Sequence, residues 1–209
     1  MTAGTIVFWR HGQTEYNAAQ RLQGQVDIPL NDLGRRQAVR AAEVLAVERR
    51  PTHVVSSDLS RAVDTAQALA ERTGLAVRTD ARLRERGFGA WEGRTHEEIR
   101  SGWPEAFASW RRGNEPEGVG AETRAEAGQR VAAAVAATAE DLHDDDVLLV
   151  VAHGAAITLA QSVLLGLDPG SWFGMTGLDN CRWSTLLPNP GRAPAWRLSS
   201  YNVGVPAEA

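Results

Sequence analysis

The stretch TIVFWRHGQTEYN (residues 5–17) decides the fold, because an apolar run ends there on a histidine, a glycine and several polar residues. The stretch VLLVVAHG (residues 147–154) repeats this order of apolar run, histidine and glycine. Short apolar runs bounded by polar residues are typical of buried strands. Since parallel strands end at the same edge of a sheet, the repeat predicts that His11 and His153 lie close together. We therefore look for function just after the strands.

Strands and helices alternate along the rest of the chain. Apolar periodicity and helix-breaking residues predict further strands at 53–55 and 76–79, and helices at 31–47, 58–72, 123–142 and 155–165. The last segments, 181–187 and 195–201, are separated by two prolines and a glycine, which is typical of an antiparallel pair at a sheet edge. The sequence thus predicts a three-layer α/β fold, with a mainly parallel central sheet, helices on both faces and an antiparallel edge near the C-terminus.

The length of 209 residues fits one domain with one well-formed core. We expect residues 82–120, which are rich in glycine and tryptophan, to form a loop-rich cover of short helices over the active site. Pairs of the Thr-x-x-Glu type at Thr95 and Thr123 predict helix starts there. An exposed surface that bears tryptophan would support a homodimer.

Composition narrows the classes of partner. The net charge of −4 argues against nucleic-acid binding, which depends on clustered positive charge. No apolar run approaches the roughly 20 residues of a membrane span, and Arg10 and His11 interrupt the first apolar stretch, so we expect no signal peptide and a cytoplasmic location. The single cysteine, Cys181, excludes an internal disulfide and is expected to be a small buried side chain.

The basic residues point to an anion. All 22 are arginines, whose guanidinium groups bind phosphate oxygens in pairs. Arg61 falls in the first turn of the helix that follows the strand at 53–55, and a helix start already favours an anion. The alternative is a surface arginine paired with Asp58 or Asp64. Together with both histidines, Arg10 and Arg61 predict a cationic pocket for a phosphoryl group.

Four motifs in order carry a resemblance to a known family. They are Arg10-His11-Gly12-Gln13-Thr14 with Asn17, Ser57-x-x-Ser60-Arg61-Ala62-x-x-Thr65-Ala66, Leu83-Arg84-Glu85, and Ala152-His153-Gly154. Over most of the chain the sequence resembles the histidine phosphatase superfamily, in its phosphoglycerate-mutase-like branch. The resemblance implies that His11 is the nucleophile, that Arg10, Arg61 and His153 bind the phosphoryl oxygens, that Glu85 is the proton donor and that Asn17 supports the pocket. It also implies that neither a metal nor another cofactor takes part.

This chemistry sets conditions on the site. His11 must be neutral to attack phosphorus, and the nearby arginines are expected to lower its pKa. His153 is expected to be a cation beside the phosphate. Glu85 can protonate the leaving group if partial burial raises its pKa. Among the polar residues that follow the His11 motif, we expect Gln23 to contact the substrate.

Other interpretations of the same residues are weaker. Both histidines with Glu85 offer ligands for zinc, but two adjacent arginines disfavour a cation. The run Asp144-Asp145-Asp146 precedes a strand, so it is interpreted as a solvated turn rather than a phosphatase motif. Trp91 fits a core position better than a wall of the substrate cavity.

Three classes of function remain. The first is a phosphomonoester hydrolase that acts through a phosphohistidine on a small phosphorylated metabolite, such as a sugar phosphate or glycerate phosphate. The second is a 2,3-bisphosphoglycerate-dependent phosphoglycerate mutase, which the pair Arg111 and Arg112 would fit. The third is a binding module without turnover, which would be expected to lack one of the cationic residues that this chain retains. The first class is our prediction.

Overall fold

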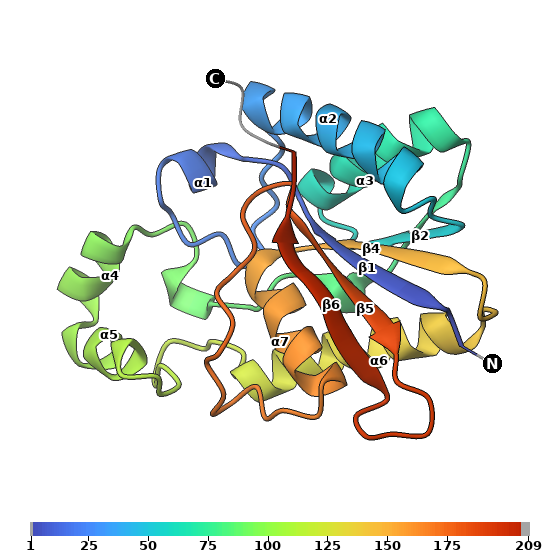
Figure 1. Ribbon diagram of the computed structural model, residues 1–209. Coiled ribbons are helices and arrows are strands. Elements are labelled where there is room, and N and C mark those ends of the chain that lie inside the picture. Colours follow the sequence, from blue (N-terminus) through green and yellow to red (C-terminus); the bar gives the residue numbers. More distant parts are fainter. Residues whose placement is uncertain (1, 206–209) are drawn as a thin grey trace.

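A six-stranded sheet forms the centre of the computed structural model, which describes residues 2–205. The strands lie in the order β3-β2-β4-β1-β5-β6 (Figure 1). Their bounds are β1 Thr5–Arg10, β2 His53–Ser56, β3 Val77–Thr79, β4 Val147–Ala152, β5 Trp183–Pro188 and β6 Trp196–Val203. Pairs within β1 to β4 are parallel, whereas β5 runs antiparallel to both β1 and β6. The predicted mainly parallel sheet with an antiparallel C-terminal edge is confirmed.

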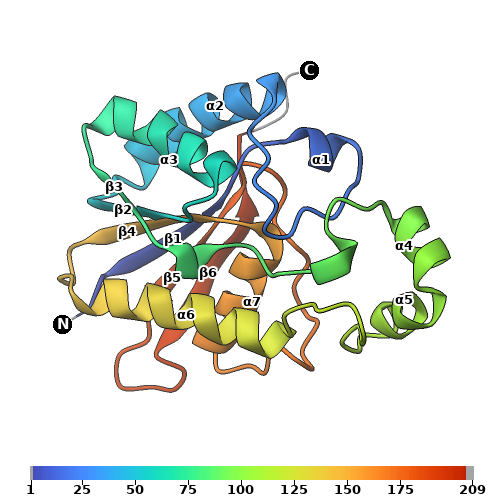
Figure 2. The same ribbon diagram turned by 180° about the vertical axis from the view of Figure 1, so that it is seen from behind.

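Helices cover both faces of this sheet (Figures 1 and 2). One face carries α2 (Asp32–Glu48) and α3 (Ser60–Thr73), and the other carries α6 (Arg124–Glu140) and α7 (Gly154–Leu164). Strand β1 shows why both are needed. Its side chains alternate between faces, so Ile6 and Phe8 join the core under α6 and α7, while Val7 and Trp9 join the core under α2 and α3.

Helix ends follow the local signals in the sequence. Thr95 and Thr123 are both N-caps with complete capping boxes, and Gly74 ends α3 in the left-handed conformation with φ 74°. The predicted start of α3 at residue 58 is two residues early. The Asp58 carboxylate binds Arg84, at 2.6 and 2.8 Å, and the chain turns into the helix only after Leu59.

A small lobe lies beside the carboxyl ends of the parallel strands (Figure 2). It contains α1 (Glu15–Ala18), the 3₁₀ turn η2 (Gly89–Trp91), and the helices α4 (His96–Gly102) and α5 (Pro104–Arg111). A second 3₁₀ turn, η1 (Ala81–Leu83), packs against α6 instead, and its Leu83 joins the core under α6 and α7. The lobe has its own apolar cluster, formed by Phe88, Trp91, Ile99 and Val119. Trp91 is fully buried there, so it is a core residue as predicted.

The tryptophan surface that would support a homodimer is not found in residues 2–205. All seven tryptophans lie within the described residues, and none of them is exposed. Trp9, Trp91, Trp183 and Trp196 are buried in the apolar clusters, because these large rings bury the most area in a chain with few aromatic residues. Within residues 2–205, no helix is both long and apolar enough to cross a membrane.

Candidate active site

The ends of β1 and β4 bring the two histidines together. Arg10 and Ala152 are the last paired residues of these parallel strands, so the next residue of each chain segment lies at the same edge. The ring centroids of His11 and His153 are 5.2 Å apart, with a 59° tilt between the ring planes. The adjacency that the repeated motif predicts is therefore present in the structure.

Backbone contacts orient the His11 ring. Its Nδ1 lies 2.7 Å from the carbonyl oxygen of Gly12, a distance that requires Nδ1 to carry the proton and donate it. The neutral ring then has its lone pair on Nε2, which is the form needed for attack on phosphorus. The His11 carbonyl accepts hydrogen bonds from Cys181 N, at 3.2 Å, and Asn180 Nδ2, at 3.0 Å.

The turn after His11 requires glycine for a steric reason. A Cβ atom at Gly12 would lie 2.4 Å from the carbonyl oxygen of Gly34 in α2. The Gly12 amide donates to Thr65 Oγ1 at 3.1 Å, and Thr65 Oγ1 donates to the Arg61 carbonyl at 2.7 Å. One threonine thus joins the His11 turn to the helix that carries Arg61. The sequence pattern included Thr65, but no role for it was predicted.

Both histidines are neutral in this structure. Burial lowers the pKa of His11 well below 6.5, and the charges of Arg10 and Arg61 lower it further. The arginine effect was predicted, and burial is the larger cause. Burial, followed by Arg61, His11 and Arg10, also lowers the pKa of His153. The His153 cation is expected beside bound phosphate, and it stays a prediction for that state. Arg61 Nε donates to His153 Nδ1 at 3.2 Å, which leaves the proton of a neutral ring on Nε2.

Two guanidinium groups face the histidines, that of the buried Arg61 and that of the half-buried Arg10. Arg61 is fully buried and donates to the carbonyls of Gly24 and Val26, at 2.8 Å each, as well as to His153. Arg10 donates through Nη1 to the carbonyl of Leu178. Within residues 2–205, the buried Nε of Arg10 has no hydrogen-bond partner. Guanidinium groups stay charged, so their remaining N–H groups form a ready site for an anion.

The surface-pair interpretation of Arg61 is wrong. Asp58 pairs with Arg84, and Asp64 lies 3.7 Å from Arg35, so neither carboxylate neutralises Arg61. The reason is position on the helix. Arg61 lies on the buried face of α3, whereas Asp64 is exposed.

Glu85 lies half-buried at the start of α7. Its Oε1 accepts from Ala156 N at 2.8 Å and from Arg86 N at 2.9 Å, while Oε2 accepts from Ala155 N at 3.1 Å. Partial burial was expected, and the three amide contacts were not. Oε2 receives only one of these bonds, so it is the oxygen with room for a proton.

Asn17 and Gln23 complete the near side of the pocket. Asn17 Oδ1 accepts from Thr14 N at 3.1 Å and from Asn180 Nδ2 at 3.2 Å. The Nδ2 amino group of Asn17 therefore faces away from these two donors. Gln23 is buried, and its Oε1 accepts from Thr14 Oγ1 at 2.9 Å. Both residues line the cavity, but the Oε1 atom of Gln23 already accepts a hydrogen bond from within the protein.

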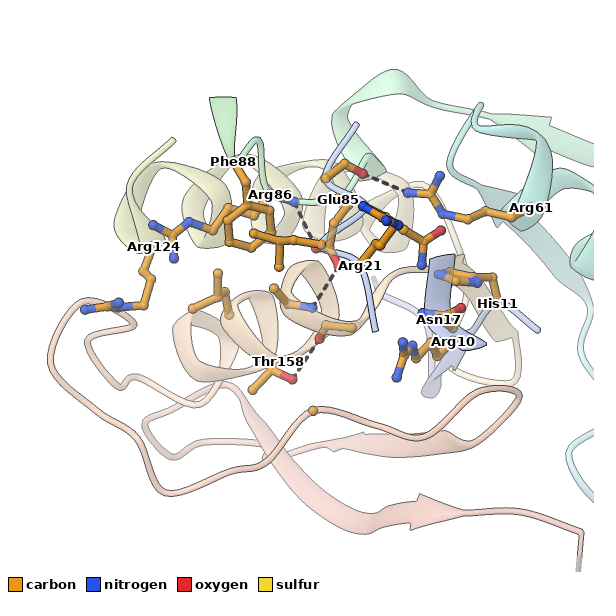
Figure 3. Close-up of a pocket in the computed structure, with 17 residues that line it drawn as sticks. Arg10, His11, Asn17, Arg21, Arg61, Glu85, Arg86, Phe88, Arg124 and Thr158 are labelled. Atoms are coloured by element: carbon orange, nitrogen blue, oxygen red, sulfur yellow. Dashed lines mark hydrogen bonds between the residues drawn. The ribbon is translucent and has the colours of Figure 1, made fainter. Parts of the chain in front are cut away.

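These residues surround one cavity of about 370 Å³. Figure 3 shows His11, Arg10 and Arg61 at one end, Phe88 and Arg124 at the other, and Glu85 between them. His153 lies behind His11 and is fully buried. The lining residues that sequence reasoning did not assign to the site include Arg86, Phe88, Arg124 and Thr158. The first two follow Glu85 directly, which is a usable signal, whereas Arg124 and Thr158 are brought in by α6 and α7.

The remaining candidate residues lie apart from this chemistry. Within residues 2–205, no group of three or more His, Cys, Asp or Glu side chains is placed to hold a metal ion. Cys181 is buried, and burial raises the pKa of its thiol, in agreement with a small core side chain. Asp144 and Asp145 are exposed in the turn before β4, as predicted.

The two depressed pKa values predict acid sensitivity of the fold. Below about pH 6.5 the unfolded chain takes up protons on both imidazoles, whereas the folded chain resists until a lower pH. The free energy of unfolding is therefore expected to fall as the pH drops from 7.5 to 5.5, as measured by urea denaturation. A His11→Asn/His153→Asn double variant should show a shallower pH dependence. An equally steep dependence in that variant would contradict this origin.

Comparisons with known proteins agree with this geometry. A family model described as the histidine phosphatase superfamily (branch 1) matches residues 6–203. The glucosyl-3-phosphoglycerate phosphatase of Mycobacterium tuberculosis is 44% identical over 216 residues, which cover 97% of this chain and 96% of that protein. A probable phosphoglycerate mutase of Yersinia enterocolitica is 37% identical, over 91% of this chain and 89% of its own length.

Solved structures show the same likeness. A mycobacterial glucosyl-3-phosphoglycerate phosphatase in complex with VO3 superposes with a TM-score of 0.85 at 40% identity, covering 96% of this chain and 99% of that one. The fold is thus shared over nearly the full length, together with about two-fifths of the residues.

Proposed function

The chain belongs to the histidine phosphatase superfamily (branch 1), and from this we propose that it hydrolyses glucosyl-3-phosphoglycerate through a phosphohistidine on His11. Phosphatase activity follows from the family and from the full-length identity to phosphatases. One observation carries the assignment of residues. His11, Arg10 and Arg61 line one end of a single cavity with the Glu85 carboxyl group beside them, and the ring of the fully buried His153 lies 5.2 Å from that of His11.

In the first step, the lone pair of His11 Nε2 attacks phosphorus and the bond from phosphorus to the ester oxygen breaks. The electron pair of that bond goes to the ester oxygen, which takes a proton from Glu85 Oε2 and leaves as the alcohol. Arg10, Arg61 and the Nε2–H of His153 would hold the phosphoryl oxygens, on which negative charge is spread in the transition state. The Gly12 carbonyl stabilises the positive charge that develops on the His11 ring, since it accepts from Nδ1.

In the second step, water attacks phosphorus and gives a proton to the Glu85 carboxylate. The bond from Nε2 to phosphorus breaks, its electron pair returns to His11, and inorganic phosphate leaves. The protein therefore ends each turnover with a neutral His11 and a protonated Glu85, ready for another ester. Asn17 is proposed to direct its free Nδ2 toward the same phosphoryl group, and Gln23 is proposed to contact the substrate.

The substrate proposal rests on the relatives and on the shape of the cavity. The curated Mycobacterium tuberculosis relative and the mycobacterial structure compared above act, by name, on glucosyl-3-phosphoglycerate. The cavity continues from the histidines past Glu85 to Phe88 and Arg124, so it offers space for a body larger than the phosphoryl group. An aromatic ring beside guanidinium groups suits the faces and hydroxyls of a sugar.

The mutase alternative loses its main sequence argument. Arg111 and Arg112 lie at the end of α5, are exposed, and are not among the residues that line the cavity. They are therefore not placed to retain a doubly phosphorylated intermediate. A binding module without turnover is also disfavoured, because every group that the chemistry needs is present around the cavity.

A substrate screen tests the proposal. Purified protein is incubated with glucosyl-3-phosphoglycerate, 3-phosphoglycerate, sugar phosphates and nucleotides, with and without 2,3-bisphosphoglycerate, and both free phosphate and isomerised product are measured. We expect phosphate release that does not need the bisphosphate, with the highest kcat/KM for glucosyl-3-phosphoglycerate. Bisphosphate-dependent isomerisation with negligible phosphate release would overturn the hydrolase assignment.

We also propose a cytoplasmic location and a homodimer. The first is supported by a single buried cysteine, which fits a reducing compartment. The second is supported by exposed apolar side chains on α2, namely Leu33, Val39 and Val47.

A further inference from the structure

One side chain from helix α6 binds the backbone around Glu85. Arg130, on α6, donates through Nη1 to the carbonyls of Arg82, at 2.6 Å, and Arg84, at 3.1 Å. Its Nη2 donates to the carbonyl of Glu85 itself at 3.4 Å. Three carbonyl groups from four consecutive residues therefore converge on one guanidinium group.

Glu122 holds the other end of the same segment. Its carboxylate accepts from Arg130 Nε and Nη2, both at 2.8 Å, so the two side chains form a bidentate pair. Glu122 Oε2 also accepts from Gly87 N at 3.1 Å, and the Glu122 amide donates to the Gly87 carbonyl at 2.9 Å. The Arg130–Glu122 pair thus forms hydrogen bonds with the backbone before and after Glu85, at residues 82–85 and at residue 87.

The Glu85 side chain is held from a different direction. Its carboxylate binds the amides of Ala155 and Ala156 at the start of α7, while its backbone is bound by Arg130 on α6. Proton transfer requires the carboxyl oxygen to lie within hydrogen-bond reach of the ester oxygen, so an error of about 1 Å can cost a hundredfold in rate. Proton transfer therefore depends on where the backbone places Glu85 as well as on its carboxyl group.

We propose that the Arg130–Glu122 pair positions Glu85 for proton transfer to the leaving group. Neither residue lines the cavity, so they act through Glu85 and do not touch the substrate. Their side chains are 24% and 20% exposed, which places the pair between a solvated surface bridge and a fully buried one. This inference rests on the proposed role of Glu85 as proton donor.

Two substrates with different leaving groups distinguish a positioning role of Arg130 and Glu122 from a merely structural one. Nitrophenolate leaves without a proton, whereas an alcohol needs one. Arg130→Met and Glu122→Gln are expected to lower the single-turnover rate of phosphoenzyme formation, the step before Glu85 acts on water, about ten- to a hundredfold for the best alkyl phosphate of the substrate screen, and less than about twofold for p-nitrophenyl phosphate. Both rates are divided by the burst of acid-labile phosphoenzyme formed with p-nitrophenyl phosphate, so that partly unfolded protein does not count.

A double variant tests whether the effect runs through Glu85. If it does, Arg130→Met causes no further loss on the alkyl phosphate once Glu85→Gln is present. Arg72→Met, which breaks an exposed pair with Glu43 between α3 and α2, is the control and should change neither rate. Parallel losses on both substrates for Arg130→Met, or full additivity with Glu85→Gln, would overturn the positioning role. If Glu85→Gln alone slows both substrates equally, the proposed donor role fails instead.

Discussion

Alanine in place of His11 is expected to lower kcat by about four orders of magnitude or more, because it removes the atom that forms the covalent intermediate. The Nδ1 contact with Gly12 leaves Nε2 as the attacking atom. No neighbouring group replaces it, since the Nδ1 of His153 is already engaged by Arg61. The measurement is phosphate release, together with trapping of acid-labile phosphate on the protein during turnover. Both signals should disappear in His11→Ala.

A matched control comes from another histidine. His143 is exposed in the turn before β4, so His143→Ala should retain full turnover and full phosphoenzyme. Circular dichroism and thermal unfolding establish that both variants are folded. Acid-labile phosphate that persists in His11→Ala, on His153 or elsewhere, would show that the nucleophile is misassigned.

Loss of the Arg61 guanidinium is expected to have the second-largest effect. Arg61→Ala should lower kcat/KM by about 10²–10³-fold or more, since a positioned donor to the developing charge of a transition state commonly contributes that much. Arg61 also donates to the carbonyls of Val26 and of Gly24, which lines the cavity beside Gln23. Its removal therefore takes away a positive charge and loosens the wall at the same time.

Arg61→Lys distinguishes these two contributions. Lysine retains the charge but has a single ammonium group, which cannot reach His153 and two carbonyls from fixed directions. We expect it to restore less than a tenth of the lost activity. Stabilisation by inorganic phosphate in thermal unfolding should also weaken in both variants. A lysine variant with wild-type kcat/KM would show that charge alone is sufficient and that the fixed directions of the guanidinium N–H groups are unimportant.

The depressed histidine pKa values link stability with function. Two neutral imidazoles beside the guanidinium groups of Arg10 and Arg61 form a site that accepts an anion and repels a proton. The arrangement stabilises the folded state only while the imidazoles remain neutral, which is why acid should weaken the fold. Bound phosphate would reverse the balance by favouring a protonated His153, and the expectation of a cation there belongs to that state.

Much of the fold was predictable because its signals are local. Apolar runs, capping boxes at Thr95 and Thr123, and a glycine stop at Gly74 give the elements to within a few residues. The error at the start of α3 has a tertiary cause, since Asp58 is held by Arg84 from a different part of the chain. Whether the tryptophans form an exposed surface was not predictable, because burial depends on packing partners, which the sequence does not display.

The sequence by itself determined the sheet, the helices on its two faces, and the adjacency of His11 and His153. Side-chain alternation fixes which face of the sheet each strand residue buries, and parallel strands place both histidines at the same edge. Only the tertiary structure decided which tautomer and charge each histidine has, since those depend on contacts with Gly12 and Arg61 and on complete burial. It also decided that Arg130 and Glu122 reach the segment around Glu85. Those contacts join residues from separate helices and loops, and local sequence pattern carries no information about such distances.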